Sequence, residues 1–175
     1  MGELKHLYRR TYNRLFGMRP MIKYIYDHCT FEPLVGAEIG IDIGVNAKNI
    51  LTHLPMSLLC LVDPFERYPS HKKKALRRLN KAGGNYLFFH ATSVDVAKRF
   101  PGAFLDFVYI DAGHKYDDVK ADIKAWYPKV KHGGVFGGHD FKARHMGLCR
   151  AVFEFALKNN LVVYGDEWDW WVIKK

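Results

Sequence analysis

The sequence predicts an α/β fold in which a doubly wound, mostly parallel sheet carries helices on both faces. From residue 35 onward, short apolar runs of strand length alternate with amphipathic runs of helical length. Strands joined by helical crossovers run parallel, and the helices then cover both faces of the sheet. A length of 175 residues with 49% hydrophobic and 15% aromatic content suits one domain with a substantial core.

The N-terminal segment predicts one or two helices, because apolar residues recur there at helical spacing. Pro20 interrupts the pattern, which then resumes at Ile22 and Ile25. We expect residues 1–35 to form a helical extension packed on the core and residues 36–175 to form the main domain. The apolar positions before the proline are Leu4, Leu7, Tyr8, Tyr12, Leu15 and Phe16.

The rest of the chain predicts five strands, five helices and a terminal hairpin-like pair. Two apolar segments, 161–164 and 170–173, flank a polar turn and make that pair. The expected strands are 36–41, 58–63, 86–90, 105–111 and 134–138. The expected helices are 46–54, 70–80, 93–100, 116–131 and 147–159.

Composition favours a cytoplasmic protein that does not enter membranes. The chain has no run of about 18 apolar residues, and its N-terminus lacks the apolar core of a secretory signal. Three cysteines far apart indicate neither a disulfide framework nor a zinc site.

The segment from Glu38 to Gly44, Glu-Ile-Gly-Ile-Asp-Ile-Gly, predicts a nucleotide-binding turn between a strand and a helix. Gly40 and Gly44 let the backbone approach a ligand closely. Asp63 ends the next strand about 20 residues later, the spacing expected for an acid that binds ribose hydroxyls.

The same turn argues against a dinucleotide. Asp42 stands where the middle glycine of G-x-G-x-x-G would fall, and two carboxylates would repel a pyrophosphate. Glu38 and Asp42 suit a cationic or zwitterionic ligand better. S-adenosylmethionine is such a ligand, since it carries a sulfonium, an ammonium and a ribose.

Polar side chains also follow two later strands of the predicted sheet. Asp111 and His114 come after one strand, and His139 and Asp140 after the next. In open α/β sheets, ligands bind beyond the carboxyl ends of the strands, so these four residues should share one rim. They could act as proton acceptors or, through Asp111 and Asp140, hold Mg²⁺ or a similar ion.

The net charge of +9 leaves the partner open. Two basic stretches could contact phosphates of a nucleic acid, bind an anionic substrate, or form solvated helix faces. They comprise Lys5, Arg9, Arg10, Arg14, Arg19 and Lys23, and Lys72, Lys73, Lys74, Arg77, Arg78 and Lys81.

Together the motifs resemble those of class I S-adenosylmethionine-dependent methyltransferases. More narrowly they resemble a small family with a Val-Asp-Pro-Phe/Trp, an Ile-Asp-x-x-His-x-Tyr and a Gly-Gly-x-x-x-Gly-His-Asp motif. The matching segments are Val62-Asp-Pro-Phe65, Ile110-Asp-Ala-Gly-His-Lys-Tyr116 and Gly133-Gly-Val-Phe-Gly-Gly-His-Asp140. The resemblance covers residues 36–141 and implies a Rossmann-like, seven-stranded sheet with an antiparallel last strand.

The resemblance also implies roles for individual residues. Glu38, Gly40 and Gly44 would line the methionine part of the cofactor, and Asp63 would bind its ribose. Ser93 would flank the adenine, and Asp111 would face the methionine moiety or the acceptor. Some relatives bind a divalent metal near the positions of Asp111 and Asp140.

The sequence thus favours methyl transfer to an oxygen, in preference to a nitrogen, of a small-molecule acceptor. His114 or His139 would remove the acceptor proton, or a metal would lower its pKa. A methyltransferase acting on RNA or DNA and a cofactor-binding protein without transfer activity remain alternatives. The acceptor could be anionic, and a homodimer is left open.

Overall fold

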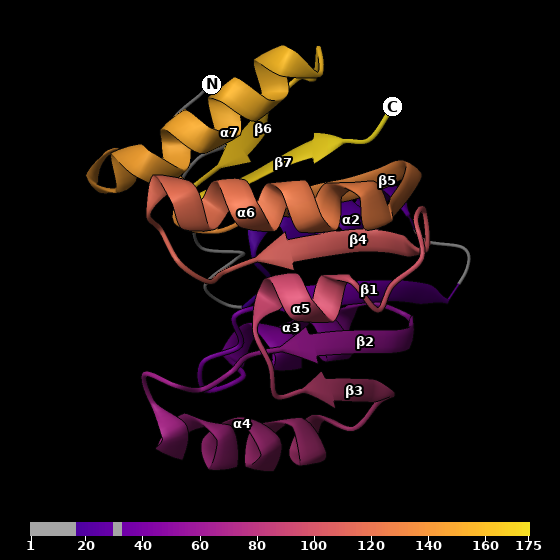
Figure 1. Ribbon diagram of the computed structural model, residues 1–175. Coiled ribbons are helices and arrows are strands. Elements are labelled where there is room, and N and C mark those ends of the chain that lie inside the picture. The colour runs from indigo at the N-terminus through magenta and orange to yellow at the C-terminus, as the bar shows by residue number, and fades with distance from the viewer. Residues whose placement is uncertain (1–16, 30–32) are drawn as a thin grey trace, which may run out of the picture.

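The computed structural model describes residues 17–29 and 33–175, which form one seven-stranded sheet in the order β3-β2-β1-β4-β5-β7-β6 (Figure 1). The first five strands pair in parallel, and β7 lies antiparallel between β5 and β6. The predicted mostly parallel sheet with an antiparallel last strand is therefore confirmed. The strands are β1 (Leu34–Ile39), β2 (Met56–Val62), β3 (Tyr86–Phe89), β4 (Leu105–Ile110), β5 (Val130–Gly138), β6 (Tyr164–Asp166) and β7 (Asp169–Ile173).

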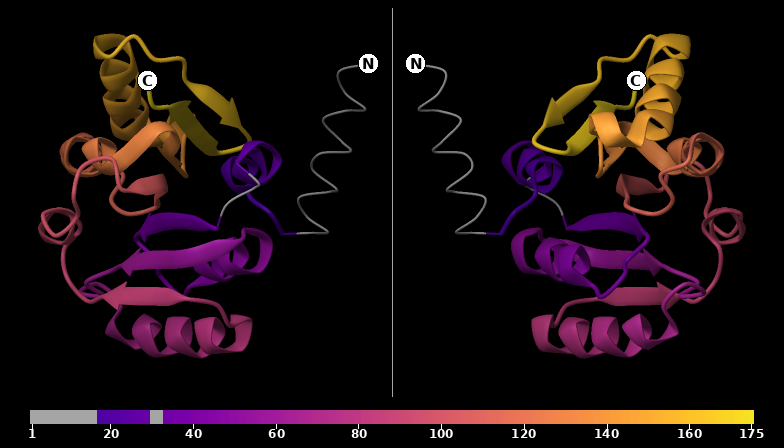
Figure 2. Two further views of the ribbon diagram at one scale, coloured as in Figure 1. Left: turned by 90° about the vertical axis from the view of Figure 1, so that its right-hand side faces the viewer. Right: turned by 90° about the vertical axis from the view of Figure 1, so that its left-hand side faces the viewer.

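Helices cover both faces of the sheet, as the alternation of elements predicts (Figure 2). One face is covered by α2 (Pro20–His28), α3 (Val45–His53) and α4 (Pro69–Ala82). The other is covered by α5 (Ser93–Ala97), α6 (Tyr116–Trp126) and α7 (Met146–Lys158). Short 3-10 turns, η1 (Tyr127–Lys129) and η2 (Ala143–His145), adjoin α6 and α7. None of the helices described is long and apolar enough to cross a bilayer.

The central strand β4 shows why the core has two halves. Phe107 and Tyr109 belong to the cluster under α2, α3 and α4, whereas Val108 and Ile110 belong to the cluster under α5, α6 and α7. Successive side chains of a strand point to opposite faces, so a strand buried on both sides is apolar almost throughout. All four residues are at most 5% exposed.

Several predicted boundaries were wrong, for local reasons. The helix expected over 116–131 ends at Trp126, because Pro128 follows in a 3-10 turn and the strand expected at 134 already begins at Val130. The helix expected over 93–100 ends at Ala97. The strand expected over 161–164 is Tyr164–Asp166, because Leu161 packs on the core before pairing with β7 begins.

Helix α2 begins with Pro20, the residue that the sequence suggested would interrupt a helix. Proline is favoured in the first helical turn, where its missing N–H has no intrahelical partner. Met21, Ile22 and Ile25 of α2 are fully buried against the sheet. The helical pattern from Leu4 to Phe16 lies outside the described residues.

Candidate active site

The carboxyl ends of β1, β2, β4 and β5 meet at one edge of the sheet, on the left in Figure 1. The register pairs Ile39 with both Val62 and Ile110, and pairs Ile110 with Gly138. The residues that follow these four positions therefore lie next to one another along this rim. They are Gly40, Asp63, Asp111 and His139.

The turn after β1 requires glycine at its first position. Gly40 has φ +82°, and a Cβ there would lie 2.4 Å from the carbonyl oxygen of Asp111. Any side chain would collide with the backbone at the end of β4. Gly44 closes the turn in the left-handed conformation and is the N-cap of α3. Asp42 also has positive φ, which aspartate tolerates, and its carboxylate pairs with His71.

Asp63 fixes this turn against the end of β2. Its Oδ2 accepts hydrogen bonds from the backbone N–H groups of Ile41 (2.9 Å) and Asp42 (3.0 Å), and its Oδ1 accepts one from Phe65 (2.7 Å). A carboxylate has about four lone-pair sites. These bonds use three of them, which leaves room for one donor from a ligand.

Glu38, the last-but-one residue of β1, is buried with one oxygen lacking a partner. The residue is 1% exposed, and its Oε1 accepts a hydrogen bond from Asn46 Nδ2 at 3.1 Å. Its Oε2 has no hydrogen-bond donor among the residues described. Burial raises the pKa of Glu38 to about 8, and the charge of Arg19 opposes the rise only in part. An orphaned buried acceptor is costly and suits a donor from a ligand.

Arg19, which precedes α2, reaches the same rim. Its Nη1 donates to Asp111 Oδ2 (2.7 Å) and to the Tyr109 hydroxyl (2.9 Å). Tyr109 donates in turn to Asp169 Oδ1 (2.7 Å), whose other oxygen accepts from the N–H of Met21 (3.0 Å). Burial raises the pKa of Asp169 to about 7.

The sequence placed Arg19 in a basic stretch and did not single out Tyr109 or Asp169. Their connection depends on contacts 60 to 148 residues apart, so no local spacing reveals it. The only local signal is that Tyr109 in β4 and Asp111 just after it lie two residues apart, the spacing of side chains on one face of a strand.

The four predicted acceptor-side residues come together. His139 Nδ1 lies 3.7 Å from Asp111 Oδ1 and 3.6 Å from Asp140 Oδ1. His114 Nε2 lies 2.8 Å from Asp140 Oδ2. Burial lowers the pKa of His139, and the nearby Arg19 lowers it further. A histidine with a lowered pKa is neutral at pH 7 and can accept a proton.

Three residues that the sequence did not select complete this region. His145 stacks on His114 with ring centroids 4.5 Å apart and lies 3.9 Å from Asp140. Lys142 pairs with Asp140 and lies 4.0 Å from the ring centroid of Trp168. Trp168 is half exposed and faces His139 edge-on, so it offers an apolar wall beside the cluster.

Within residues 17–29 and 33–175, two groups of side chains have donor atoms close enough to hold a metal: Asp111, His139 and Asp140, and His114, Asp140 and His145. Cationic side chains already pair with both carboxylates, Arg19 with Asp111 and Lys142 with Asp140. Mg²⁺ prefers ligand sets made of oxygens. Mixed imidazole and carboxylate groups with neutralised charges therefore fit Mg²⁺ poorly.

The Ser93 hydroxyl at the start of α5 forms hydrogen bonds with two side chains of α6. The hydroxyl donates to Asp122 and accepts a hydrogen bond from Trp126 Nε1 at 2.8 Å. Burial raises the pKa of Asp122 to about 6. The predicted contact of Ser93 with an adenine would therefore use its backbone rather than its hydroxyl.

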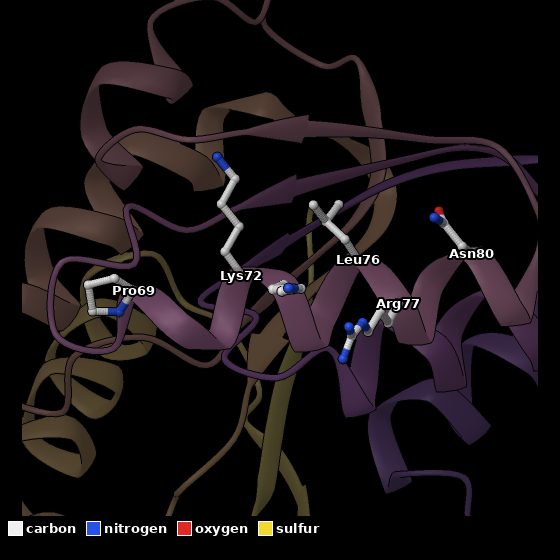
Figure 3. A pocket seen from close by; sticks show the side chains of 6 residues that line it. Pro69, Lys72, Leu76, Arg77 and Asn80 are labelled. Atoms are coloured by element: carbon white, nitrogen blue, oxygen red, sulfur yellow. The ribbon is translucent and has the colours of Figure 1, made fainter.

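A hollow of about 420 Å³ lies along α4, apart from the residues of the rim (Figure 3). Lys72, Leu76 and Asn80 project from one side of the helix toward it. Some of the basic groups on α4 make contacts within the chain. Lys72 Nζ lies 3.1 Å from His90 Nδ1, and Arg78 donates to the carbonyl of Ile43.

Solved structures share this fold at low sequence identity. A protein from Corynebacterium glutamicum has a TM-score of 0.71 and 17% identity, covering 97% of this chain and 88% of its own. An O-methyltransferase from Bacillus cereus in complex with S-adenosylhomocysteine has a TM-score of 0.69 and 15% identity. The match covers 88% of this chain and 79% of the Bacillus cereus protein. A Podospora anserina methyltransferase, also bound to S-adenosylhomocysteine, has a TM-score of 0.71 and 13% identity. The match covers 89% of this chain and 76% of the Podospora anserina protein.

The sequence comparison with protein families is more specific than the structural one. No curated protein sequence matches the chain significantly. A family model described as a methyltransferase domain matches residues 37–141, which runs from β1 to just beyond β5. The matched stretch includes the glycine turn, Asp63, Asp111 and the residues that follow β5. The chain belongs to this methyltransferase domain family.

Proposed function

We propose that the protein transfers a methyl group from S-adenosylmethionine to an oxygen, in preference to a nitrogen, of a small-molecule acceptor. The observation that carries this proposal is the buried Glu38 carboxyl with a free oxygen beside the glycine turn. Family membership and the ligands of the structural neighbours support it: two neighbours of the same fold are methyltransferases bound to S-adenosylhomocysteine.

In this proposal residues at the ends of β1, β2 and β4 would hold the cofactor. Glu38 meets the ammonium of its methionine part, and Gly40 and Gly44 let the backbone approach it. Asp63 accepts a ribose hydroxyl at its remaining lone pair, and residues around Ser93 flank the adenine. Holding the sulfonium methyl in line with the acceptor oxygen supplies most of the catalysis.

His139 is the best-placed group to remove the acceptor proton. It is neutral at pH 7, and Asp111 and Asp140 lie within 3.7 Å of its Nδ1, where their charges would stabilise the imidazolium that forms. His114 supports Asp140 from the other side. Because Asp111 and Asp140 fit Mg²⁺ poorly, no step of this mechanism depends on a metal.

A nucleic-acid acceptor is a second candidate because of the exposed basic groups along α4. Lys73, Lys74 and Arg77 remain exposed, and the hollow beside them is lined by basic side chains. Phosphate contacts would make binding strongly salt-dependent, which binding of a small acceptor would not be. A small acceptor fits better, because the groups able to do chemistry lie on the rim and none of them lines this hollow.

S-adenosylhomocysteine is expected to raise the melting temperature of the protein, whereas NAD is not. A ligand that binds only the folded state stabilises it by about 2.7 kcal/mol at 100 times its Kd. A differential scanning fluorimetry titration with both ligands measures the shifts. Equal shifts with the two ligands, or no shift with S-adenosylmethionine and S-adenosylhomocysteine, would contradict the proposed function.

Replacing Asp63 with asparagine is expected to weaken S-adenosylhomocysteine binding about 10- to 100-fold. Hydrogen bonds to a charged group contribute roughly 1.5–3 kcal/mol, and the substitution also loosens the turn that Asp63 holds through Ile41 and Asp42. Isothermal titration calorimetry measures the change. Asp27→Asn, at an exposed position near the end of α2, is the control and should bind like the wild type. Unchanged affinity in folded Asp63→Asn would remove Asp63 from the cofactor site.

A further inference from the structure

Arg19 reaches the rim at Asp111 and is held there by two hydrogen bonds. Its guanidinium hydrogen-bonds to Asp111 and Tyr109, and Tyr109 is fixed by the buried Asp169. The residue directly follows Met18, which is 6% exposed, and directly precedes the buried start of α2. The guanidinium position is therefore set by the fold before any ligand binds, which lowers the entropy that binding must cost.

The guanidinium still has donors available for a ligand. Both of its hydrogen bonds to described residues come from Nη1, so its Nη2 and Nε hydrogens have no acceptor within the described part of the chain. Its side chain is 26% exposed, so the residue is partly accessible to solvent.

A guanidinium and a buried carboxyl group lie near the glycine turn, on neighbouring parts of the rim. Glu38 of β1 lies opposite Tyr109 of β4 in the sheet, and the Tyr109 hydroxyl accepts a hydrogen bond from Arg19. Glu38 Oε2 is buried and receives no hydrogen bond from any described residue. A ligand with an ammonium and a carboxylate on one carbon would satisfy both groups at once, and an α-amino acid end has this chemistry.

We propose that Arg19 binds the carboxylate of the amino-acid end of the cofactor while Glu38 binds its ammonium. The inference rests on the proposed function, because it names the residue that selects a cofactor carrying an intact amino acid. Arginine suits the task, since its planar fork matches a carboxylate and its charge persists at all physiological pH values.

The rival explanation is a purely structural ion pair, in which Arg19 only ties the start of α2 to Asp111 and Tyr109. The two explanations differ in one respect. A structural ion pair affects all ligands of the rim equally, whereas a carboxylate-binding arginine affects only ligands that carry the carboxylate.

The test compares S-adenosylhomocysteine with its decarboxylated analogue, which has the same adenosine, sulfur and amine but no carboxylate. Calorimetry on the full chain gives both dissociation constants for the wild type and for Arg19→Met, which keeps the apolar stem. The wild type is expected to prefer S-adenosylhomocysteine about 10- to 100-fold, the size of a charge-assisted hydrogen bond. Arg19→Met should lose most of this preference, through weaker binding of S-adenosylhomocysteine alone.

Two further variants sharpen the comparison. Arg19→Lys keeps the charge without the fork and should retain part of the preference. Lys23→Met removes a cation one turn along α2, where it pairs with Asp27, and should retain all of it.

The remaining outcomes each overturn a different claim. Equal affinity of the wild type for both ligands overturns the carboxylate contact, and this measurement needs no variant to fold. Equal weakening of both ligands in folded Arg19→Met assigns Arg19 to the structural role instead. If the wild type binds neither ligand, the proposed function itself is wrong, and the two failures are thereby distinguished.

Discussion

Replacing His139 with alanine is expected to slow methyl transfer about 10²- to 10⁴-fold while cofactor binding survives. This is the usual contribution of a positioned general base. His139 lies between Asp111 and Asp140, and burial keeps its pKa below the ordinary value of 6.5. The transfer rate of the wild type should therefore fall only when the pH drops below about 6.5, and this acid limb should be absent in the variant.

The measurement is the rate at which S-adenosylhomocysteine forms in the presence of an acceptor that the wild-type protein methylates. The rate is measured across a range of pH values. His132→Ala, at an exposed position near the start of β5, is the control and should keep the wild-type rate. A metal-dependent mechanism gives a different pattern: chelators, Asp111→Ala and Asp140→Ala would each abolish transfer while cofactor binding persists. A wild-type rate in His139→Ala, with its acid limb intact, would mean that another group takes the proton.

The rim could be predicted from the sequence because its residues directly follow apolar strands. Gly40, Asp63, Asp111 and His139 come next after β1, β2, β4 and β5, so the rule for open sheets places them together once the strands are recognised. Strand recognition needs only runs of apolar residues of the right length.

The remaining part of the site could not be predicted, because distant segments supply it. Arg19 looks like any cation in a basic stretch until α2 packs on the sheet beside β7 and brings it to Asp111. Asp169 resembles a turn residue, yet it is buried under Tyr109. Ser93, the first residue of α5, was expected to flank the adenine, and the sequence did not reveal that its hydroxyl bonds to Asp122.

Replacing Glu38 with glutamine is expected to stabilise the protein at high pH while it weakens cofactor binding. Burial raises the pKa of Glu38 from 4.5 to about 8, so the folded state holds a proton that the unfolded state releases between these values. The free energy of unfolding of the wild type should therefore decrease as the pH rises from about 4.5 to 8. Glutamine has no proton to lose and keeps the carbonyl oxygen that Asn46 can contact.

Urea unfolding between pH 5 and pH 9 measures this difference. At pH 9 the variant should be more stable than the wild type by on the order of 3 kcal/mol, and near pH 5 the two should be similar. Glu154→Gln, on the exposed face of α7, is the control and should not reproduce this gain.

Calorimetry should show weaker S-adenosylhomocysteine binding in Glu38→Gln, because a neutral amide attracts an ammonium less than a carboxylate does. A buried group that costs stability when charged, yet strengthens binding of a cation, is expected of a binding site rather than of a packing core. Parallel stability curves for the two proteins, or unchanged cofactor affinity, would contradict that role for Glu38.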